Sequence, residues 1–250
     1  MRRREMMSGK PKPKTQRARN ARPRRSTQAK NKNSAKSLVL YTTALVVLFL
    51  AIFMINRAMN DHQDAKRYDD PPSIVNQPVI GSEQAKVTLI EFGDYKCPSC
   101  KQWSERIYPQ LKAQYIDSGQ AKLAFINTLF HGEESRLGAL AGEAVLAQNK
   151  EAFWEFNEAM FAAQPDYESA WLTEQKIKEV ADSLPTRIDA QKLMDDVANG
   201  TTSSQVDLDT SLVNKYRINQ TPTLIINGTV VKNPFDINEI KSIIDQNLGD

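Results

Sequence analysis

Two cysteines separated by only two residues do most to constrain how this 250-residue chain can fold. The stretch Cys97-Pro98-Ser99-Cys100, called the CPSC motif below, holds both cysteines of the sequence and follows the apolar run Val87-Thr88-Leu89-Ile90-Glu91-Phe92. A strand that leads into a helix at Cys97 would point the helix N-terminus at the first sulfur, and a thiol pair at this spacing can close into a disulfide. The motif therefore indicates redox chemistry.

Two structural interpretations of the motif are less favourable. A disulfide that closes so short a loop would stabilise the fold by only about 2 kcal/mol, against about 3 kcal/mol for a fifteen-residue loop. A closed zinc site needs four ligands, and the only histidines are His62, in a polar stretch, and His131. We therefore expect neither a structural cross-link nor a metal site.

Charge divides the chain into two unequal parts. Residues 1–36 carry 14 lysines and arginines and a single acid, Glu5, whereas residues 37–250 carry 19 basic and 29 acidic side chains. A basic arm can bind nucleic acid, but this one runs directly into an apolar segment. We predict a disordered cytoplasmic arm over residues 1–36 that lies against anionic lipid, with no nucleic-acid partner.

The apolar segment is long enough to cross a membrane. No charged residue occurs from Ser37 to Asn56, and twenty helical residues span about 30 Å, the thickness of the hydrocarbon core. Lysines and arginines crowd its N-terminal side, which places the arm in the cytoplasm and the rest of the chain outside. We predict a single-pass signal anchor over residues 37–56; no convincing small-x-small cleavage site follows, although one sequence leaves cleavage open. Outside the membrane, disulfides persist.

A polar linker is predicted over residues 57–78, followed by one folded domain over 79–250. Val87 to Phe92 has few polar breaks, which predicts a central strand buried on both faces. A helix is predicted from Cys97 to about Tyr115, with Trp103, Ile107, Leu111 and Tyr115 on its apolar face. Ala121 to Leu129 then predicts a second strand, completing a strand-helix-strand unit.

The middle of the domain is predicted to be helical, over about residues 133–200. Pro165 and Pro185 divide it into three or more helices, and its bulky side chains are predicted to form core: Phe153, Trp154, Phe156, Met160 and Phe161. A further helix is predicted from about Ser204 to Tyr216.

The end of the chain predicts a hairpin and a last helix. Thr223 to Ile226 is apolar and rich in β-branched residues, Asn227-Gly228 is a two-residue hairpin turn, and the chain returns from Thr229 to Val231. Asp236, with Glu239 three residues later, predicts a capping box that opens the last helix.

This order of elements, with the CPSC motif at the first strand-helix junction, resembles a thioredoxin fold with an inserted helical subdomain, an α/β fold, preceded here by one N-terminal transmembrane helix. The sequence resembles the DsbA-like thiol:disulfide oxidoreductases, closest to the membrane-anchored BdbD type of Gram-positive bacteria. The resemblance covers roughly residues 79–250 and rests on these stretches: Gly81 with Ala85 to Thr88, Glu91 to Cys100, Phe153-Trp154, and Thr221-Pro222-Thr223 before Asn227-Gly228.

The resemblance implies a role for each site residue. Cys97 would be the nucleophile that forms a mixed disulfide with substrate, and Cys100 the resolving thiol. Pro222 would be a cis-proline that faces the sulfurs and leaves the Thr221 backbone free to pair with an extended substrate; alternatively it is an ordinary strand-start proline. Glu91 would be a buried acid that takes the proton from Cys100 through water; alternatively it is a strand-end acid.

Pro98 and Ser99 lie between the sulfurs, and Ser99 is a departure from the DsbA proteins of Gram-negative bacteria, which carry histidine there. Without an imidazolium, Cys97 would depend on the helix N-terminus, the Ser99 hydroxyl and Lys96 or Lys101, although Lys96 is better interpreted as a solvated surface charge. We therefore predict a thiolate less stabilised than in a Pro-His pair.

By resemblance, the chain introduces disulfide bonds into reduced exported proteins, uses no bound cofactor, and is reoxidised by a quinone-linked membrane protein of the DsbB or BdbC type. Two alternatives stay open: a thiol reductase or isomerase on the same fold, and a membrane-tethered chaperone that binds peptides at Pro222. The spacing of Glu133, Glu134 and Asp166 does not say whether these acids gather into a calcium site.

Overall fold

The computed structural model describes residues 32–61, 66–166 and 169–249, and the side chains of residues 38–55 in its first helix. The chain divides into two compact units, Met1–Gln63 and Asp64–Asp250. The first contains helix α1, Lys32–Asp61, and the second contains every other element. The predicted basic arm lies outside the described residues as far as residue 31, and residues 32–36, predicted to be disordered, belong to α1.

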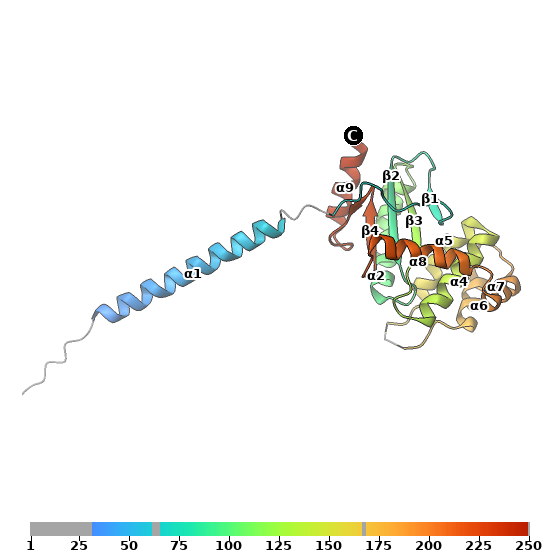
Figure 1. The fold of residues 1–250 in the computed structure, drawn as a ribbon, viewed down its shortest axis with the longest axis horizontal. Coiled ribbons are helices and arrows are strands. Elements are labelled where there is room, and N and C mark those ends of the chain that lie inside the picture. The colour runs from blue at the N-terminus through green and yellow to red at the C-terminus, as the bar shows by residue number, and fades with distance from the viewer. Residues whose placement is uncertain (1–31, 62–65, 167–168, 250) are drawn as a thin grey trace, which may run out of the picture. The chain divides into compact units, whose positions relative to one another are not determined.

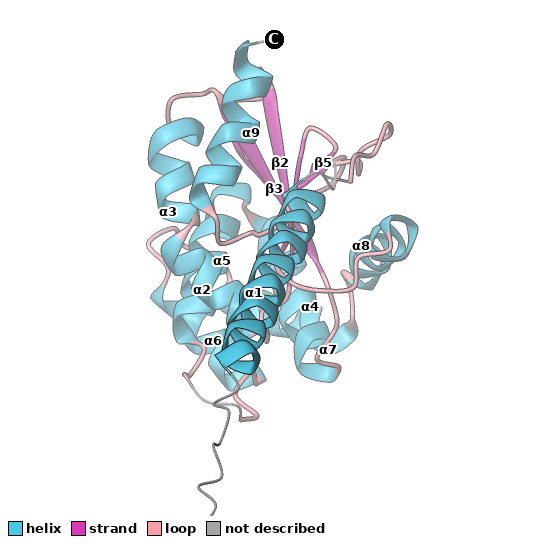
Figure 2. Ribbon diagram, turned by 90° about the vertical axis from the view of Figure 1, so that its left-hand side faces the viewer, coloured by secondary structure: helices cyan, strands magenta, loops and turns pink. Residues whose placement is uncertain are grey.

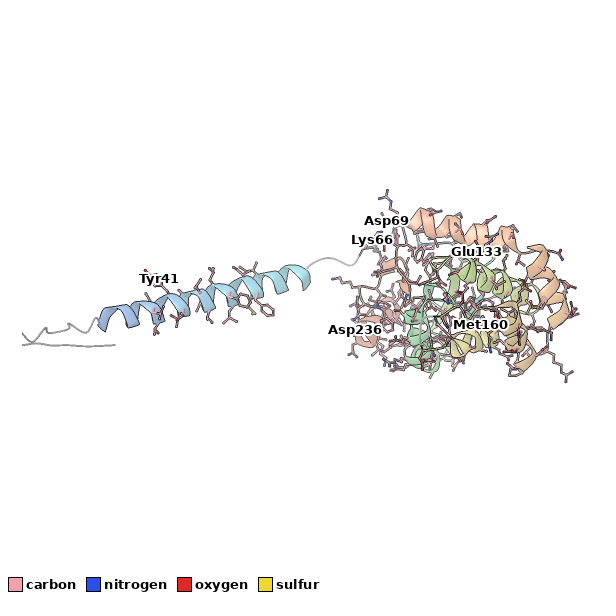
Figure 3. All side chains as sticks on the ribbon, turned by 90° about the horizontal axis from the view of Figure 1, so that it is seen from below. Tyr41, Lys66, Asp69, Glu133, Met160 and Asp236 are labelled. Carbon is pink, nitrogen blue, oxygen red and sulfur yellow. The ribbon has the colours of Figure 1, made fainter. Side chains whose placement is uncertain are left out.

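Helix α1 is long and apolar enough to cross a membrane. Its stretch Leu38–Ile55 has a mean hydropathy of 2.7, and none of it is buried within the protein. Tyr41 and the apolar side chains around it project outward along the helix (Figure 3). Leaving so much apolar surface in water would be strongly unfavourable, whereas a lipid bilayer would accept it.

The second unit is built on a five-stranded sheet in the order β1-β3-β2-β4-β5. Its strands are β1 Val79–Gly81, β2 Val87–Gly93, β3 Ala121–Asn127, β4 Thr223–Ile226 and β5 Thr229–Val230. β2 and β3 are parallel, and the other neighbours are antiparallel. The predicted central strand is confirmed, because β2 pairs on both edges and is almost completely buried. The three-residue β1 was not predicted; it is too short to show a strand period.

Each face of the sheet packs against its own set of helices. Ile90 and Phe92 of β2 pack with Leu212 and Tyr216 of α8, Ser203–Tyr216. Leu89 lies on the other face, in the large core that includes residues of α2, Pro98–Arg106, α3, Tyr108–Leu111, and α9, Ile237–Gly249. Figure 2 shows α8 on one side of the strands and α3 and α9 on the other.

The helix that follows the CPSC motif is interrupted, contrary to the single helix predicted to about Tyr115. α2 ends at Arg106, α3 occupies Tyr108–Leu111, and a π-helical turn runs from Lys112 to Ile116. Pro109 explains the break, because its ring removes a backbone donor and clashes with the preceding turn. The apolar face survives the break: Trp103, Ile107, Leu111 and Tyr115 are all buried.

Four helices form the predicted helical insertion, and they gather at one end of the domain (Figure 1). They are α4 Glu133–Gln148, α5 Lys150–Ala163, α6 Glu174–Ser183 and α7 Ala190–Asn199. The predicted aromatic core is confirmed, since the side chains of Phe153, Phe156, Met160 and Phe161 are at most 1% exposed. Figure 3 shows Met160 inside this helical end of the domain.

The C-terminal hairpin and cap are largely as predicted. Asn227 and Gly228 both adopt positive φ, 44° and 87°, which suits the two-residue turn between β4 and β5. Asp236 caps α9 by accepting hydrogen bonds from the backbone N–H groups of Asn238 and Glu239. The second bond of the predicted capping box, from the Asp236 N–H to the Glu239 side chain, does not form. The Glu239 carboxylate instead accepts from the backbone N–H groups of Lys232 and Asn233.

The polar linker predicted over residues 57–78 differs in the structure. α1 continues to Asp61, and the chain from Lys66 onward packs on the domain. Arg67 forms an isolated antiparallel β-bridge with Thr229, and the Val230 N–H donates to the Lys66 carbonyl. The Tyr68 ring packs edge-on against the Tyr216 ring. The open edge of β5 explains this contact, because its unpaired backbone groups gain partners.

Truncating Phe161 should destabilise the domain, because its ring is buried against Tyr95 and Phe125. We expect Phe161→Ala to lower the free energy of unfolding by about 3–5 kcal/mol, measured by urea denaturation. Ala162→Ser, at the next, exposed position of α5, should cost less than about 0.5 kcal/mol. Equal midpoints for the two variants would contradict this assignment of the core.

Candidate active site

The CPSC motif lies where β2 leads into α2. Cys97 is the N-cap residue of α2, with extended backbone angles (φ −76°, ψ 119°), and Pro98 is its first residue. Proline suits this position, because the missing N–H would have had no partner within the helix. Cys97 is 7% exposed and Cys100 is fully buried, and both are free thiols.

The surroundings of Cys97 favour its thiolate and lower its pKa to about 5. The largest cause is a hydrogen bond from the Cys100 thiol; burial acts in the opposite direction. A side-chain hydrogen bond from Thr221 and the backbone N–H groups of Cys100 and Ser99 also lower the pKa. Ser99 thus acts through its backbone at the helix N-terminus, where partial positive charge gathers.

Cys100 behaves in the opposite way. Burial raises the pKa of its thiol well above the usual range, and the neighbouring Cys97 raises it further. At neutral pH the first sulfur of the pair is therefore ionised, whereas the second keeps its proton.

Glu91 lies within β2, close enough to both cysteines for their charges to affect one another. It is 3% exposed, and burial, followed by the charge of Cys97, raises the pKa of its carboxyl well above the usual range. Its Oε1 has no hydrogen-bond partner among the described residues. Glu91 is therefore a buried carboxyl near the motif that loses its proton less readily than an exposed glutamate.

The Thr221–Pro222 peptide bond is cis. The Cys97 thiol donates to the Thr221 carbonyl oxygen across 3.5 Å, so the loop before β4 faces the first sulfur. The structure thus brings together the residues selected from the sequence: Glu91, Cys97, Pro98, Ser99, Cys100, Thr221 and Pro222.

The two lysines beside the motif hold the helical insertion. Lys96 Nζ lies 2.8 Å from Glu134 Oε2 and also donates to the Ser169 carbonyl. Lys101 Nζ lies 2.7 Å from Asp166 Oδ1 and donates to the Gln164 carbonyl. The interpretation of Lys96 as a solvated charge is therefore wrong, because its side chain is only 15% exposed and paired.

These ion pairs involve two of the three acids whose spacing left a calcium site open. Glu134 and Asp166 lie against Lys96 and Lys101. Nowhere in the described part of the chain do three or more His, Cys, Asp or Glu side chains gather in a metal-binding group.

Asp94 is a site residue that the sequence analysis missed. Its buried carboxylate accepts hydrogen bonds from the Lys96 and Phe130 backbone N–H groups and the Ser135 hydroxyl, and it lies 2.8 Å from His131 Nδ1. Asp94 therefore joins the entrance of the motif to the loop after β3. Its place directly after β2 was a signal, but Phe130, His131 and Ser135 lie 36, 37 and 41 residues away in the chain.

Two further buried carboxyls lie where β3 ends. The Asn127 side-chain amide donates to Glu143 at 3.0 Å and to Asp209 at 2.8 Å, and Gln77 donates to Asp209. Burial, and then the charge of Asp209, raise the pKa of Glu143 to about 8, and burial raises the pKa of Asp209 to about 6. Both belong to the interior of the domain rather than to the motif.

A thiol titration tests the electrostatics of the motif. We expect the rate of Cys97 alkylation in the reduced protein to rise with a midpoint near pH 5 and to stay level above it. A midpoint near the ordinary thiol value of about 8.5 would contradict stabilisation of the thiolate, and one near the DsbA value of about 3.5 would contradict the weaker stabilisation predicted for Ser99.

A matched pair of variants tests the largest cause of the lowered Cys97 pKa, the hydrogen bond from Cys100. Cys100→Ala removes the hydrogen bond to the Cys97 sulfur and should raise the pKa of Cys97, whereas Cys100→Ser keeps a hydroxyl donor and should change it less. Equal midpoints for the two variants would show that the Cys100 donor is unimportant.

Comparisons with known proteins agree with this geometry. A family model described as thioredoxin matches residues 73–246. Disulfide bond formation protein D of Bacillus subtilis (strain 168) is 44% identical over 177 residues, which cover 71% of this chain and 79% of the relative. The probable disulfide bond formation protein D of Bacillus anthracis is 30% identical and covers 88% of this chain and 99% of its own length.

Solved structures show the same fold. The crystal structure of oxidised BdbD from Bacillus subtilis matches with a TM-score of 0.71 at 42% identity, covering 75% of this chain and all of that one. Chlamydia trachomatis DsbA matches with a TM-score of 0.63 at 21% identity, over 72% of this chain and 95% of its own, which shows the fold alone. The chain therefore belongs to the thioredoxin family, with the disulfide bond formation D proteins among its relatives.

Proposed function

We propose that this chain is a membrane-anchored thiol:disulfide oxidoreductase that introduces disulfide bonds into exported proteins. The observation that carries the proposal is the opposite behaviour of its two sulfurs, a stabilised thiolate at Cys97 and a buried thiol at Cys100. A disulfide whose reduced form is stabilised in this way is a strong oxidant. The names of the Bacillus relatives support the same direction.

The reaction begins with the Cys97–Cys100 disulfide. A substrate thiolate attacks Cys97 Sγ and forms a mixed disulfide, and Cys100 leaves and takes up a proton that Glu91 can supply. A second substrate thiolate then attacks the substrate sulfur of the mixed disulfide and releases Cys97 as a thiolate. The substrate has lost two electrons and two protons, and the CPSC motif has been reduced.

The pKa of Cys97 sets the scale of the driving force. A shift from the reference value of 9.0 to about 5 is worth on the order of 3 kcal/mol near pH 7, or about 60 mV for this two-electron couple. The stabilisation of the reduced form is largest above the unperturbed pKa and is lost as the pH falls through about 5. We therefore expect the protein to be a weaker oxidant in acid.

Substrate binding is proposed at the cis-proline loop. The Thr221–Pro222 loop faces the Cys97 sulfur, and the Thr221 backbone can pair with an extended chain as an added strand would. A reduced, unfolded protein offers such extended chains.

Helix α1 supports a place at the membrane. With the basic arm on the cytoplasmic side, the domain would lie outside the cytoplasm, where exported chains arrive and disulfides persist. Turnover requires an electron acceptor, and we propose a quinone-linked membrane protein of the DsbB or BdbC type. Anchoring would keep the two proteins in one plane.

The reduction potential distinguishes an oxidant from a reductase. We expect the full chain in detergent, equilibrated with glutathione buffers, to give a value clearly above about −200 mV, towards the value of about −120 mV known for a strong oxidant. A value near −270 mV, typical of thioredoxin, would instead identify a reductase. Tryptophan fluorescence reads the equilibrium, and alkylation of free thiols checks it.

Removal of the nucleophile tests the mechanism. Cys97→Ser should abolish oxidation of a reduced model protein, because a serine hydroxyl cannot form the disulfide. Ser104→Ala, on α2 and outside the motif, should keep the wild-type rate. Oxidation that survives in Cys97→Ser would overturn the mechanism, whereas a Cys97/Cys100 double serine variant that still rescues secretion would favour the chaperone function.

A further inference from the structure

A carboxylate–imidazole pair lies beside the CPSC motif. Asp94 begins the loop that leaves β2, and His131 lies in the loop between β3 and α4. His131 Nδ1 is 2.8 Å from Asp94 Oδ2; the Asp94 side chain is fully buried, whereas the His131 side chain is 39% exposed. A neutral imidazole that donates from Nδ1 to this carboxylate has Nε2 left as an acceptor.

The imidazole is held firmly in place. Asp94 Oδ2 also accepts from the Phe130 N–H and the Ser135 hydroxyl, and the His131 N–H donates to Ser135 Oγ. The Thr128 N–H and hydroxyl both donate to the Gly93 carbonyl, which joins this loop to the end of β2. The ring therefore has a defined position relative to the motif.

His131 lines a cavity that is also bordered by one residue of the motif, Pro98, the residue after Cys97. The cavity has a volume of about 380 Å³. Lys96 and Glu134 are the charged groups of its wall, and their ion pair of 2.8 Å leaves neither free to accept a proton. Glu134 also accepts from the Trp171 and Leu172 N–H groups.

The substrate presents a proton that must be removed. An ordinary cysteine has a pKa of about 8.5, so near pH 7 most substrate sulfurs are thiols rather than the thiolates that attack disulfides. A base within reach of the incoming thiol would raise the fraction that can react.

We propose that His131, oriented by Asp94, accepts the proton of the substrate thiol as that thiol attacks Cys97; this rests on the proposed function. The proton passes from the substrate sulfur to Nε2, the substrate–Cys97 bond forms, and the Cys97–Cys100 bond breaks. Cys100 takes up a proton, and His131 later returns its own to solvent. Asp94 stabilises the transient imidazolium, as an orienting carboxylate does in other catalytic sites.

Two peptides that differ in one atom test the proposal. The oxidised full chain in detergent is mixed under argon, near pH 7, with a peptide that carries one cysteine or with the same peptide carrying selenocysteine. The selenol is already ionised and needs no base. We expect His131→Gln to slow attack by the cysteine peptide by about tenfold or more and to leave attack by the selenocysteine peptide unchanged, as followed by tryptophan fluorescence.

Chemical rescue supplies the second measurement. His131→Ala should react with the cysteine peptide as slowly as His131→Gln does. Added imidazole should restore part of the lost rate. Glu133→Gln, an exposed neighbour outside the cavity, is the matched control and should react as wild type with both peptides.

Two results would overturn the proposal. Equal slowing of both peptides by His131→Gln would mean that His131 only positions the motif, and no slowing of either would mean that it plays no part. Wild-type protein that reacts with neither peptide would overturn the proposed function itself.

Discussion

The unequal burial of two neighbouring sulfurs is the constraint on which the rest of the site depends. Cys97 lies at the N-terminus of α2, where it receives hydrogen bonds from the Cys100 thiol and from backbone N–H groups, while Cys100 lies one helical turn inside the core. The same hydrogen bond lowers the pKa of one thiol and raises that of the other. Glu91 adds a buried acid that cannot ionise easily beside a thiolate. The motif therefore favours its reduced form, which is the physical basis of an oxidant.

The sheet and the helical insertion both hold the segments around the CPSC motif in place. Parallel pairing of β2 with β3 brings the ends of both strands to one edge, so that the loop carrying His131 meets the entrance of the motif at Asp94. Lys96 and Lys101 then fasten the segment after α5 to the motif through Glu134, Asp166 and backbone carbonyls. These lysines stabilise structure, and they are not among the groups that lower the pKa of Cys97.

Much of the fold could be predicted because its patterns are local. The period and length of Val87 to Phe92, the Asn227-Gly228 turn and the aromatic positions of α5 each specify an element without reference to the rest of the chain. Predictions were wrong where a second segment decides the outcome. The Glu239 carboxylate accepts from the backbone N–H groups of Lys232 and Asn233 instead of from that of Asp236. The stretch from Lys66 pairs with β5 although its composition is that of a linker. The break at Pro109 was readable locally but was hidden by the apolar period around it.

The sequence by itself determined the chemistry: a thiol pair at a strand-helix junction, a proline far along the chain that resembles a cis-proline, an acid six residues before the first sulfur, and an apolar segment long enough for a membrane. Only the tertiary structure decided how these groups act on one another. Phe130 reaches Asp94, Glu134 reaches Lys96 and Thr221 reaches Cys97 across 36, 38 and 124 residues of the chain. Burial and hydrogen bonding, which set each pKa, exist only once those loops have met, because no local pattern encodes the distance between them.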